Sequence, residues 1–414
     1  MPLGAAVVIF AVHSTSSNIT SFDSSWYVPT ARSLIAEGDT NLNEFADIVQ
    51  EGDYRLETAE GNLYTIFPVG TPLLAVPVVA LVDKILFPRI DDSDYLNRND
   101  TATVERFVAS VFVTLAAVCI FSTAYCLTGS LSQSLLAMLV FAFCTAAWST
   151  ASRALWQHGP SMLMLALTMF VIVRSKKTPG LIALAGLTLA LSYTVRPTNS
   201  LSVLILSLYV MLEHRQYFLR YLFCGAVVAV PFIIYNFTIY GAILPPYYMP
   251  ARIGSNPDFV EALAGNLISP SRGLLLFSPV LLFAVHGVGL RWSSGYWNSL
   301  DLSLLVIIIL HLATVSSFPQ WWAGHSFGPR FMSDVLPYLI YFLLPAISRV
   351  ASGLRRGEGR FYAGSFLLCM TLSFYVHFRG ATSWSVYDWN THPTNIDAAP
   401  ERLWDWSDPQ FLRR

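Results

Sequence analysis

A single carboxylate, Asp23, stands just after the first apolar stretch of the chain, in the segment SFDSSWYVPTARSLIAEGD (21–39). A carboxylate at the edge of a membrane is unfavourable unless it has a partner or a role. Two interpretations are open. Asp23, like Ser24 or Ser25, can cap the helix that is predicted to follow. Alternatively, Asp23 can act as a general base that takes a proton from a hydroxyl group bound at the membrane surface.

Five arginines are predicted to lie at or near the ends of apolar spans on the same side as Asp23: Arg153, Arg196, Arg272, Arg330 and Arg379. One arginine at a span end commonly reaches toward lipid headgroups. However, loops on the outer side of a membrane are normally poor in Lys and Arg, so five at one level indicate a shared anion. Guanidinium groups bind phosphate in a bidentate manner. We therefore predict that Arg153, Arg196, Arg272 and Arg330 converge on one phosphate site.

Aromatic and histidine side chains accumulate in the same outer segments; the candidates are Trp26, Tyr27, Tyr247, Trp322, His158 and His325. The aromatic rings fit an interfacial belt, but they would also stack on sugar rings. Histidines near an interface are usually structural, yet two of them near arginines and an acid favour a functional site. His158 is also a candidate ligand for a divalent metal.

The composition identifies the class of protein that carries these residues. Of 414 residues, 54% are hydrophobic and 12% are charged, whereas soluble domains carry roughly 25% charged residues. This balance indicates a membrane protein with many spans. The net charge of −1 argues against a nucleic-acid partner. The five cysteines lie inside apolar runs without a CxxC pair, so we expect them to pack in the core.

Eleven apolar runs have about the length of a membrane-spanning helix, which predicts an all-α, polytopic membrane protein. The predicted spans are 2–17, 104–127, 131–149, 160–174, 180–195, 199–213, 218–240, 272–290, 300–318, 331–348 and 361–378. The prediction places the protein in a cell or plasma membrane as a multi-pass protein.

Basic residues set the predicted orientation, because short cytoplasmic loops collect Lys and Arg. Four basic loops are expected inside: 174–177, 213–220, 290–292 and 348–360. A further apolar run, 69–88, then cannot cross, and its prolines and central Asp83 suit a helix along the outer face. We expect one transmembrane domain, 1–378, whose outer segment 18–103 carries juxtamembrane helices and ends in an acidic loop, 89–103. The tail 379–414 is expected outside, packed near the mouth of the site.

The order of these features resembles the GT-C superfamily of membrane glycosyltransferases, which includes protein O-mannosyltransferases and aminoarabinose transferases. The matching features are Asp23 after the first span, the proline-marked stretch YTIFPVGTPLLAVP (64–77), the Arg-headed span ERFVASVFVTLAAVC (105–119), and Ser152-Arg153. The stretch WWAGHSFGPRF (321–331) also looks like late outer-loop motifs of bacterial relatives. Together these motifs extend over most of the chain.

The resemblance implies membrane helices with outer juxtamembrane helices, and a site on the outer face. It implies a polyprenyl-phosphate donor carrying a hexose or pentose, and a lipid, glycan or protein acceptor. Asp23 would be the catalytic base, and Arg153 would contact the phosphate. Two departures stand out: many relatives have a second acid after Ser-Arg, where this chain has His158, and a Lys or His before the proline, where it has Phe67. A divalent metal is therefore an open question.

The alternative function is a transporter or a flippase for a lipid carrier, without catalysis, and a catalytically inactive scaffold is a third possibility. Eleven spans and prolines within them are compatible with transport. The span interiors, however, contain few of the acids that couple ions or protons to movement. The long polar segment 18–68 is also unusual for a carrier.

Overall fold

The computed structural model describes residues 2–414 except 19–21, 87–97, 250–253, 296 and 357–358. Within these residues the regular secondary structure is almost entirely helical, as predicted. Most of the acidic loop 89–103 lies outside the described residues.

Six helices in the described part are long and apolar enough to cross a membrane. They contain α4 (Arg98–Thr128), α6 (His158–Ser175), α9 (Phe218–Tyr240), α13 (Ser299–Ser316), α14 (Leu336–Arg356) and α15 (Arg360–Thr382). Each coincides with one of the predicted spans. The protein is therefore a helical protein of membrane type, and the higher count of eleven spans stays a prediction.

The other five predicted spans contain shorter helices. These include α1 (Pro2–Thr15), α5 (Leu131–Phe143), α7 (Leu184–Val195), α8 (Ser200–Glu213) and α12 (Leu282–Ser293). The run 272–290 is interrupted because α11 (Leu274–Phe277) ends just before Pro279, whose ring lacks an N–H for a continuing helix. A short helix that was not predicted, α10 (Phe259–Ile268), packs against α13.

The bundle holds together by close contacts between helices. For example, α7 approaches α9 so closely that a Cβ added to Gly186 would lie 2.1 Å from the carbonyl oxygen of Tyr221. Helix α14 runs through the interior, whereas α9 and α15 lie at the margin with most of their apolar surface exposed. That exposed surface is what lipid contact requires.

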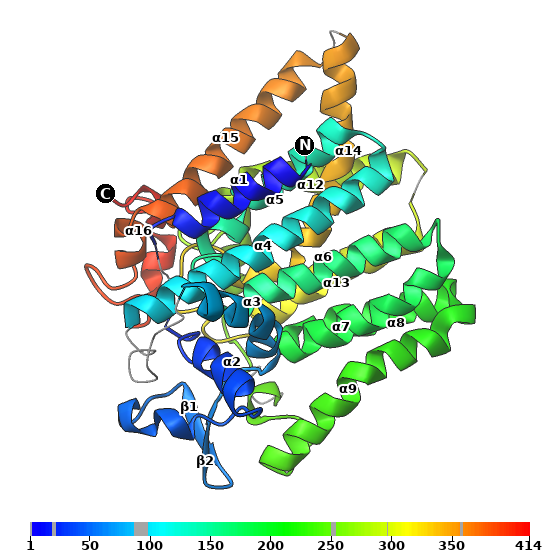
Figure 1. Cartoon of the computed structure of the whole chain (residues 1–414). Coiled ribbons are helices and arrows are strands. Elements are labelled where there is room, and N and C mark those ends of the chain that lie inside the picture. Colours follow the sequence, from blue (N-terminus) through cyan, green and yellow to red (C-terminus); the bar gives the residue numbers. More distant parts are fainter. Residues whose placement is uncertain (1, 19–21, 87–97, 250–253, 296, 357–358) are drawn as a thin grey trace.

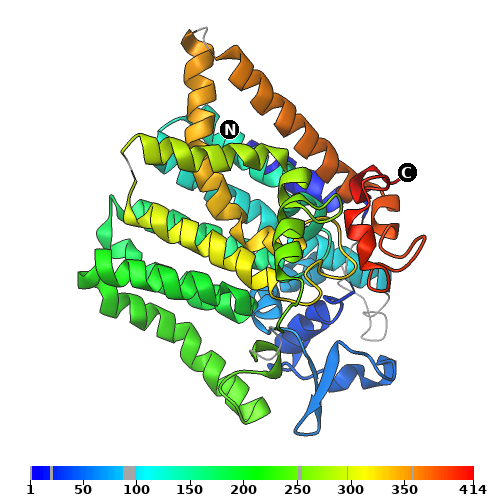
Figure 2. The same ribbon diagram turned by 180° about the vertical axis from the view of Figure 1, so that it is seen from behind.

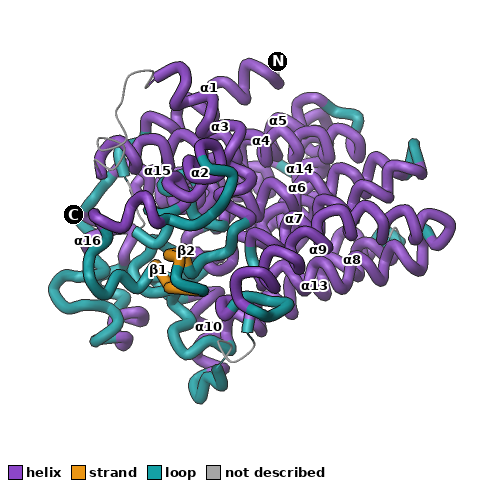
Figure 3. Tube along the Cα trace, turned by 60° about the horizontal axis from the view of Figure 1, so that its bottom comes forward, coloured by secondary structure: helices purple, strands orange, loops and turns teal. Residues whose placement is uncertain are grey.

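The polar segments gather at one end of the long helices (Figures 1 and 2). This end carries α2 (Tyr27–Ala36), α3 (Gly70–Leu86), a two-stranded hairpin and the carboxyl-terminal tail with α16 (Ser385–Asp388). The loops of the same end surround the hairpin in Figure 3. The chain thus brings its first and last polar segments to one region.

The hairpin is an exception to the all-α prediction. Strand β1 (Leu56–Ala59) pairs antiparallel with β2 (Asn62–Thr65). The two turn residues, Glu60 and Gly61, have φ of 49° and 80°. Two left-handed residues in succession form the tight turn that matches the twist of paired strands, so this sequence closes a hairpin within a helical protein.

Helix α3 covers most of the run that was predicted to lie along the outer face. Its Asp83 accepts two hydrogen bonds from Arg32 of α2, with Nε–Oδ2 and Nη2–Oδ1 distances of 2.9 and 2.8 Å. This bidentate pair joins α2 and α3 into one unit beside the bundle. The position of that unit relative to a membrane stays a prediction.

Candidate functional site

A cavity of about 1280 Å³ opens at the polar end of the bundle. It is lined from six parts of the chain, with residues in the ranges 22–54, 156–157, 193–201, 244–249, 314–331 and 384–397. Its wall is apolar at Leu201, Leu244 and Phe318, and charged at Asp23 and Arg330. A cavity with both kinds of wall suits an amphiphilic ligand.

Asp23 lies on this cavity and contacts two side chains there. Its Oδ1 accepts a hydrogen bond of 2.7 Å from the hydroxyl of Tyr54, and its Oδ2 lies 3.7 Å from Nη2 of Arg330. Burial and the hydrogen bond to Asp23 raise the pKa of Tyr54, so its hydroxyl stays a donor at neutral pH. Helix α2 has Trp26 at its N-cap and no side-chain cap, so the capping interpretation of Asp23 has no support there.

Arg330 presents its guanidinium to the cavity beside Asp23. The group stacks on Trp156, with 4.1 Å between the guanidinium carbon and the ring centroid. The preceding turn is fixed by Gly328, whose φ of +63° and close contact with Phe277 exclude a larger residue. Among the described residues, Nε of Arg330 has no hydrogen-bond partner. Arg330 therefore keeps donor capacity for an anion.

Arg196 also lines the cavity, but protein groups occupy part of its guanidinium. Its Nη1 lies 3.1 Å from Oδ2 of Asp334 and also bonds Nδ1 of His158. Asp334 is buried and accepts further hydrogen bonds from Ser161 and Thr198. Arg196 thus brings a positive charge to the cavity that Asp334 partly neutralises.

Arg153 does not line the cavity, contrary to the predicted convergence of four arginines. It is fully buried and donates to the backbone carbonyls of Trp148, Ser16 and His13. The last two carbonyls belong to the end of α1 and the residue after it, where backbone oxygens lack helical partners. Arg153 therefore joins α1 to the segment after α5 and has little capacity left for a phosphate.

Arg272 is the second arginine that stands apart from the cavity. Its guanidinium donates to the carbonyls of Trp322, Gly324 and Ser271 and to the side chains of Gln410 and Asn390. These partners use its full set of five donors. Arg272 holds the loop 319–330 to the carboxyl-terminal tail, which explains its burial without an anion.

The tail packs back on the protein, as we expected. Trp404 donates a hydrogen bond of 2.9 Å to Glu261 of α10, and the Leu403 carbonyl accepts one of 2.6 Å from Ser269. Gln410 is fully buried and bonds the backbone of the loop 319–330 at Ser326 and Gly328. The tail is therefore a structural part of this end of the molecule.

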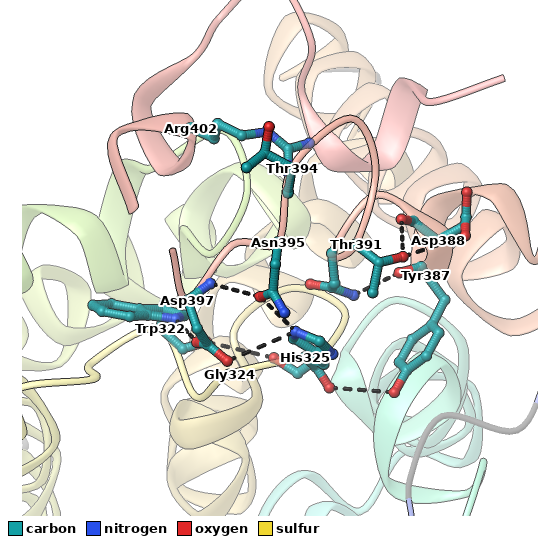
Figure 4. A network of polar contacts seen from close by, with 12 residues as sticks. Trp322, Gly324, His325, Tyr387, Asp388, Thr391, Thr394, Asn395, Asp397 and Arg402 are labelled. Carbon is teal, nitrogen blue, oxygen red and sulfur yellow. Dashed lines mark hydrogen bonds and ion pairs between the residues drawn. The ribbon is translucent and has the colours of Figure 1, made fainter. Parts of the chain in front are cut away.

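The tail also supplies one wall of the cavity, at a polar network around His325 (Figure 4). Nε2 of His325 lies 2.9 Å from Oδ1 of Asn395 and 3.7 Å from Oδ2 of Asp397. Asp397 also accepts a hydrogen bond of 2.8 Å from Nε1 of Trp322. Tyr387 donates to the His325 carbonyl over 3.5 Å. Of the predicted residues, His325 is at the cavity, whereas Trp322 is buried behind it.

Some of the remaining predicted residues line the cavity or a recess beside it, and others are buried away from it. Tyr247 lines the cavity, and His158 and Tyr27 line a smaller recess beside it. Trp26 is buried and donates a hydrogen bond of 3.0 Å to Asp53. Trp26 therefore stabilises the segment that carries Asp23. Several cavity residues were not predicted from the sequence: Tyr54, Gln157, Trp384, Tyr387, Asp388, Thr391 and Asp397. These residues come from segments far apart in the chain, so the sequence alone does not show that they lie near Asp23. Only the mixture of aromatic and acidic residues in the tail indicated that part of this set belongs to the site.

The described residues offer no site that fits a divalent metal. In the part of the chain that the structure describes, no group of three or more His, Cys, Asp or Glu side chains could hold a metal ion. His158 in particular faces the guanidinium of Arg196, whose positive charge opposes a cation.

No protein-family model matches this chain, and no curated protein matches it significantly.

Proposed function

We propose that this chain is a membrane glycosyltransferase that moves a sugar from a polyprenyl-phosphate donor to a hydroxyl of a lipid, glycan or protein acceptor. The observation that carries the proposal is the meeting of Asp23 and Arg330 on one amphiphilic cavity. A base for the acceptor and a cation for the leaving phosphate are the two groups that this reaction needs.

The reaction assigns each group a role. Asp23 takes the proton of the acceptor hydroxyl as the acceptor oxygen bonds to the anomeric carbon. The bond between that carbon and the phosphate oxygen breaks, and its electron pair stays on the phosphate. Arg330, supported by Arg196, stabilises the charge that develops there. The products are an inverted glycoside, polyprenyl phosphate and a proton that leaves Asp23 afterwards.

The apolar and polar walls of the cavity support a polyprenyl-phosphate sugar as the substrate. The apolar wall at Leu201, Leu244 and Phe318 suits the isoprenoid part next to the phosphate. The tail wall offers Trp384 and Tyr387 as aromatic faces and His325 and Asp397 as hydrogen-bonding groups, which suit a sugar. In this proposal the cavity faces the outer side of the membrane.

The test uses full-length protein in liposomes, with radiolabelled sugars on polyprenyl phosphate and extracted envelope lipids, glycans or proteins as acceptors. We expect label to move to an acceptor and polyprenyl phosphate to appear in equal amount. If labelled donor instead crosses the bilayer intact, without any transfer, the protein is a lipid-carrier flippase and the proposal is wrong.

A further inference from the structure

A small recess of about 60 Å³ adjoins the main cavity. Asp23, Arg196, Arg330 and Trp156 line both the recess and the main cavity, and Tyr27 lines the recess. The recess therefore brings two guanidinium groups next to two aromatic side chains that carry polar atoms.

Three buried polar atoms of residues that line the recess have no hydrogen-bond partner among the described residues: the Tyr27 hydroxyl, Nε1 of Trp156 and Nε of Arg330. Tyr27 and Trp156 are only 2% and 4% exposed. Gln157 and Thr71 are polar neighbours of the Tyr27 hydroxyl, and the Thr71 hydroxyl also has no hydrogen-bond partner among the described residues. Buried polar groups are almost always paired, so three such atoms in residues around one recess indicate a ligand that supplies acceptors.

The chemistry of the three atoms selects the ligand. An indole N–H and a guanidinium N–H can only donate, and a tyrosine hydroxyl can donate as well. With the charge of Arg196 nearby, the recess suits an oxyanion that has several acceptor oxygens, such as a phosphoryl group. The carboxylate of Asp23 opposes an anion, but Arg330 and Tyr54 already face its charge.

We infer that the recess holds the phosphoryl group of the lipid ligand through Tyr27, Trp156 and Arg330, and holds a phosphate monoester more tightly than a diester. This inference rests on the proposed function. Sugar transfer turns a diester with one negative charge into a monoester with a charge of roughly −1.5 to −2 at pH 7. A recess of donors therefore retains the product, and polyprenyl phosphate inhibits the enzyme until another step removes it.

Binding to the full-length protein in detergent micelles tests the inference without turnover. The probes are farnesyl phosphate, farnesyl methyl phosphate, farnesol and inorganic phosphate, and dissociation constants come from titration calorimetry. We expect farnesyl phosphate to bind at least tenfold more tightly than the methyl diester, and farnesol not to bind. Equal affinity for monoester and diester contradicts the inference, as does failure of every phosphate to bind. Inorganic phosphate that binds as tightly as farnesyl phosphate would identify free phosphate as the ligand and exclude a lipid headgroup.

Two substitutions remove single donors and keep an aromatic side chain: Tyr27→Phe, which keeps the ring, and Trp156→Phe, which replaces the indole with a phenyl ring. Each should weaken the binding of farnesyl phosphate by roughly tenfold, because a hydrogen bond to a charged group is lost. Tyr27→Phe should leave the melting temperature of the ligand-free protein unchanged, since the Tyr27 hydroxyl has no hydrogen-bond partner among the described residues. Trp156→Phe also shrinks the buried ring on which Arg330 stacks, so it should lower the melting temperature as well as the affinity. The matched control is Tyr338→Phe, whose buried hydroxyl bonds Ser202 at 2.9 Å. This control should lower the melting temperature and leave binding unchanged; the reverse pattern would overturn the inference.

The variant Asp23→Asn separates this inference from the proposed function. It should abolish transfer but bind farnesyl phosphate as tightly as the wild type or more so, because a negative charge leaves the recess. Binding with the expected preference in a wild-type protein that never transfers sugar would contradict the proposed function alone. Transfer without any preference for the monoester would contradict the recess alone.

Discussion

Nη2 of Arg330 lies 3.7 Å from Oδ2 of Asp23, across the charged wall of the cavity. Charge-assisted hydrogen bonds between such groups measure about 2.7–2.9 Å, so this pair is close without direct contact. The separation lets Arg330 act on a substrate oxygen while its charge still stabilises the carboxylate. The geometry of this pair therefore leaves Arg330 available to a substrate oxygen, whereas a direct salt bridge would occupy its guanidinium.

Replacing Asp23 with Asn should lower the transfer rate by about 10²–10⁴-fold, because an amide cannot take the acceptor proton. The melting temperature should stay close to that of the wild type, since the amide oxygen still accepts from Tyr54. The control is Asp47→Asn, an exposed acid of the same segment that does not line the cavity. Near-normal transfer by the Asp23 variant would refute its role as the base.

Replacing Tyr54 with Phe should reduce transfer by roughly tenfold and leave folding intact, because one charged hydrogen bond that orients Asp23 is lost. Burial and the Asp23 carboxylate raise the pKa of Tyr54. In the wild type its hydroxyl therefore stays protonated up to and beyond the ordinary value of about 10. Rates measured from pH 7 to pH 10 should show no loss caused by Tyr54; an alkaline loss that disappears in the Phe variant would contradict this assignment.

The four arginines of the predicted phosphate site should divide into two classes. Arg330→Gln should weaken donor binding at least tenfold with little change in stability, because the guanidinium has unused donor capacity. Arg153→Gln should instead lower the free energy of unfolding by about 3 kcal/mol or more, since it leaves buried carbonyls unpaired at about 1–3 kcal/mol each. Donor titration and thermal melts of both variants separate these outcomes; the same effect from both would contradict the division.

Replacing Gln410 with Ala should loosen the tail, because Arg272 and the Gly328 amide lose a buried acceptor. We expect a loss of about 2 kcal/mol in stability and faster proteolytic cleavage within 395–414. Transfer should fall as well, since the tail forms one wall of the cavity. A matched exposed change, Gln50→Ala, should alter none of these properties. Unchanged cleavage and transfer in the Gln410 variant would show that the tail is dispensable.

The amino-acid sequence by itself determined the helical class and the six longest apolar helices, because a run of apolar residues is a local property. It also determined that Asp23 would follow the first apolar helix and that Arg330 would follow a Gly-Pro turn. The hairpin 56–65 was missed, because Glu60-Gly61 is a weaker turn signal than the usual Asn-Gly or Asp-Gly.

Only the tertiary structure decided which arginines reach the cavity. Arg153 finds its carbonyl partner at Ser16, 137 residues away, and Arg272 finds Gln410, 138 residues away. A guanidinium can bind backbone carbonyls as well as an anion, and the sequence does not say which of these will lie nearby. The same reason explains why the sequence predicted that the tail packs near the site but not that Asp397 lines the cavity. The position of Asp397 depends on packing between distant segments rather than on any local pattern.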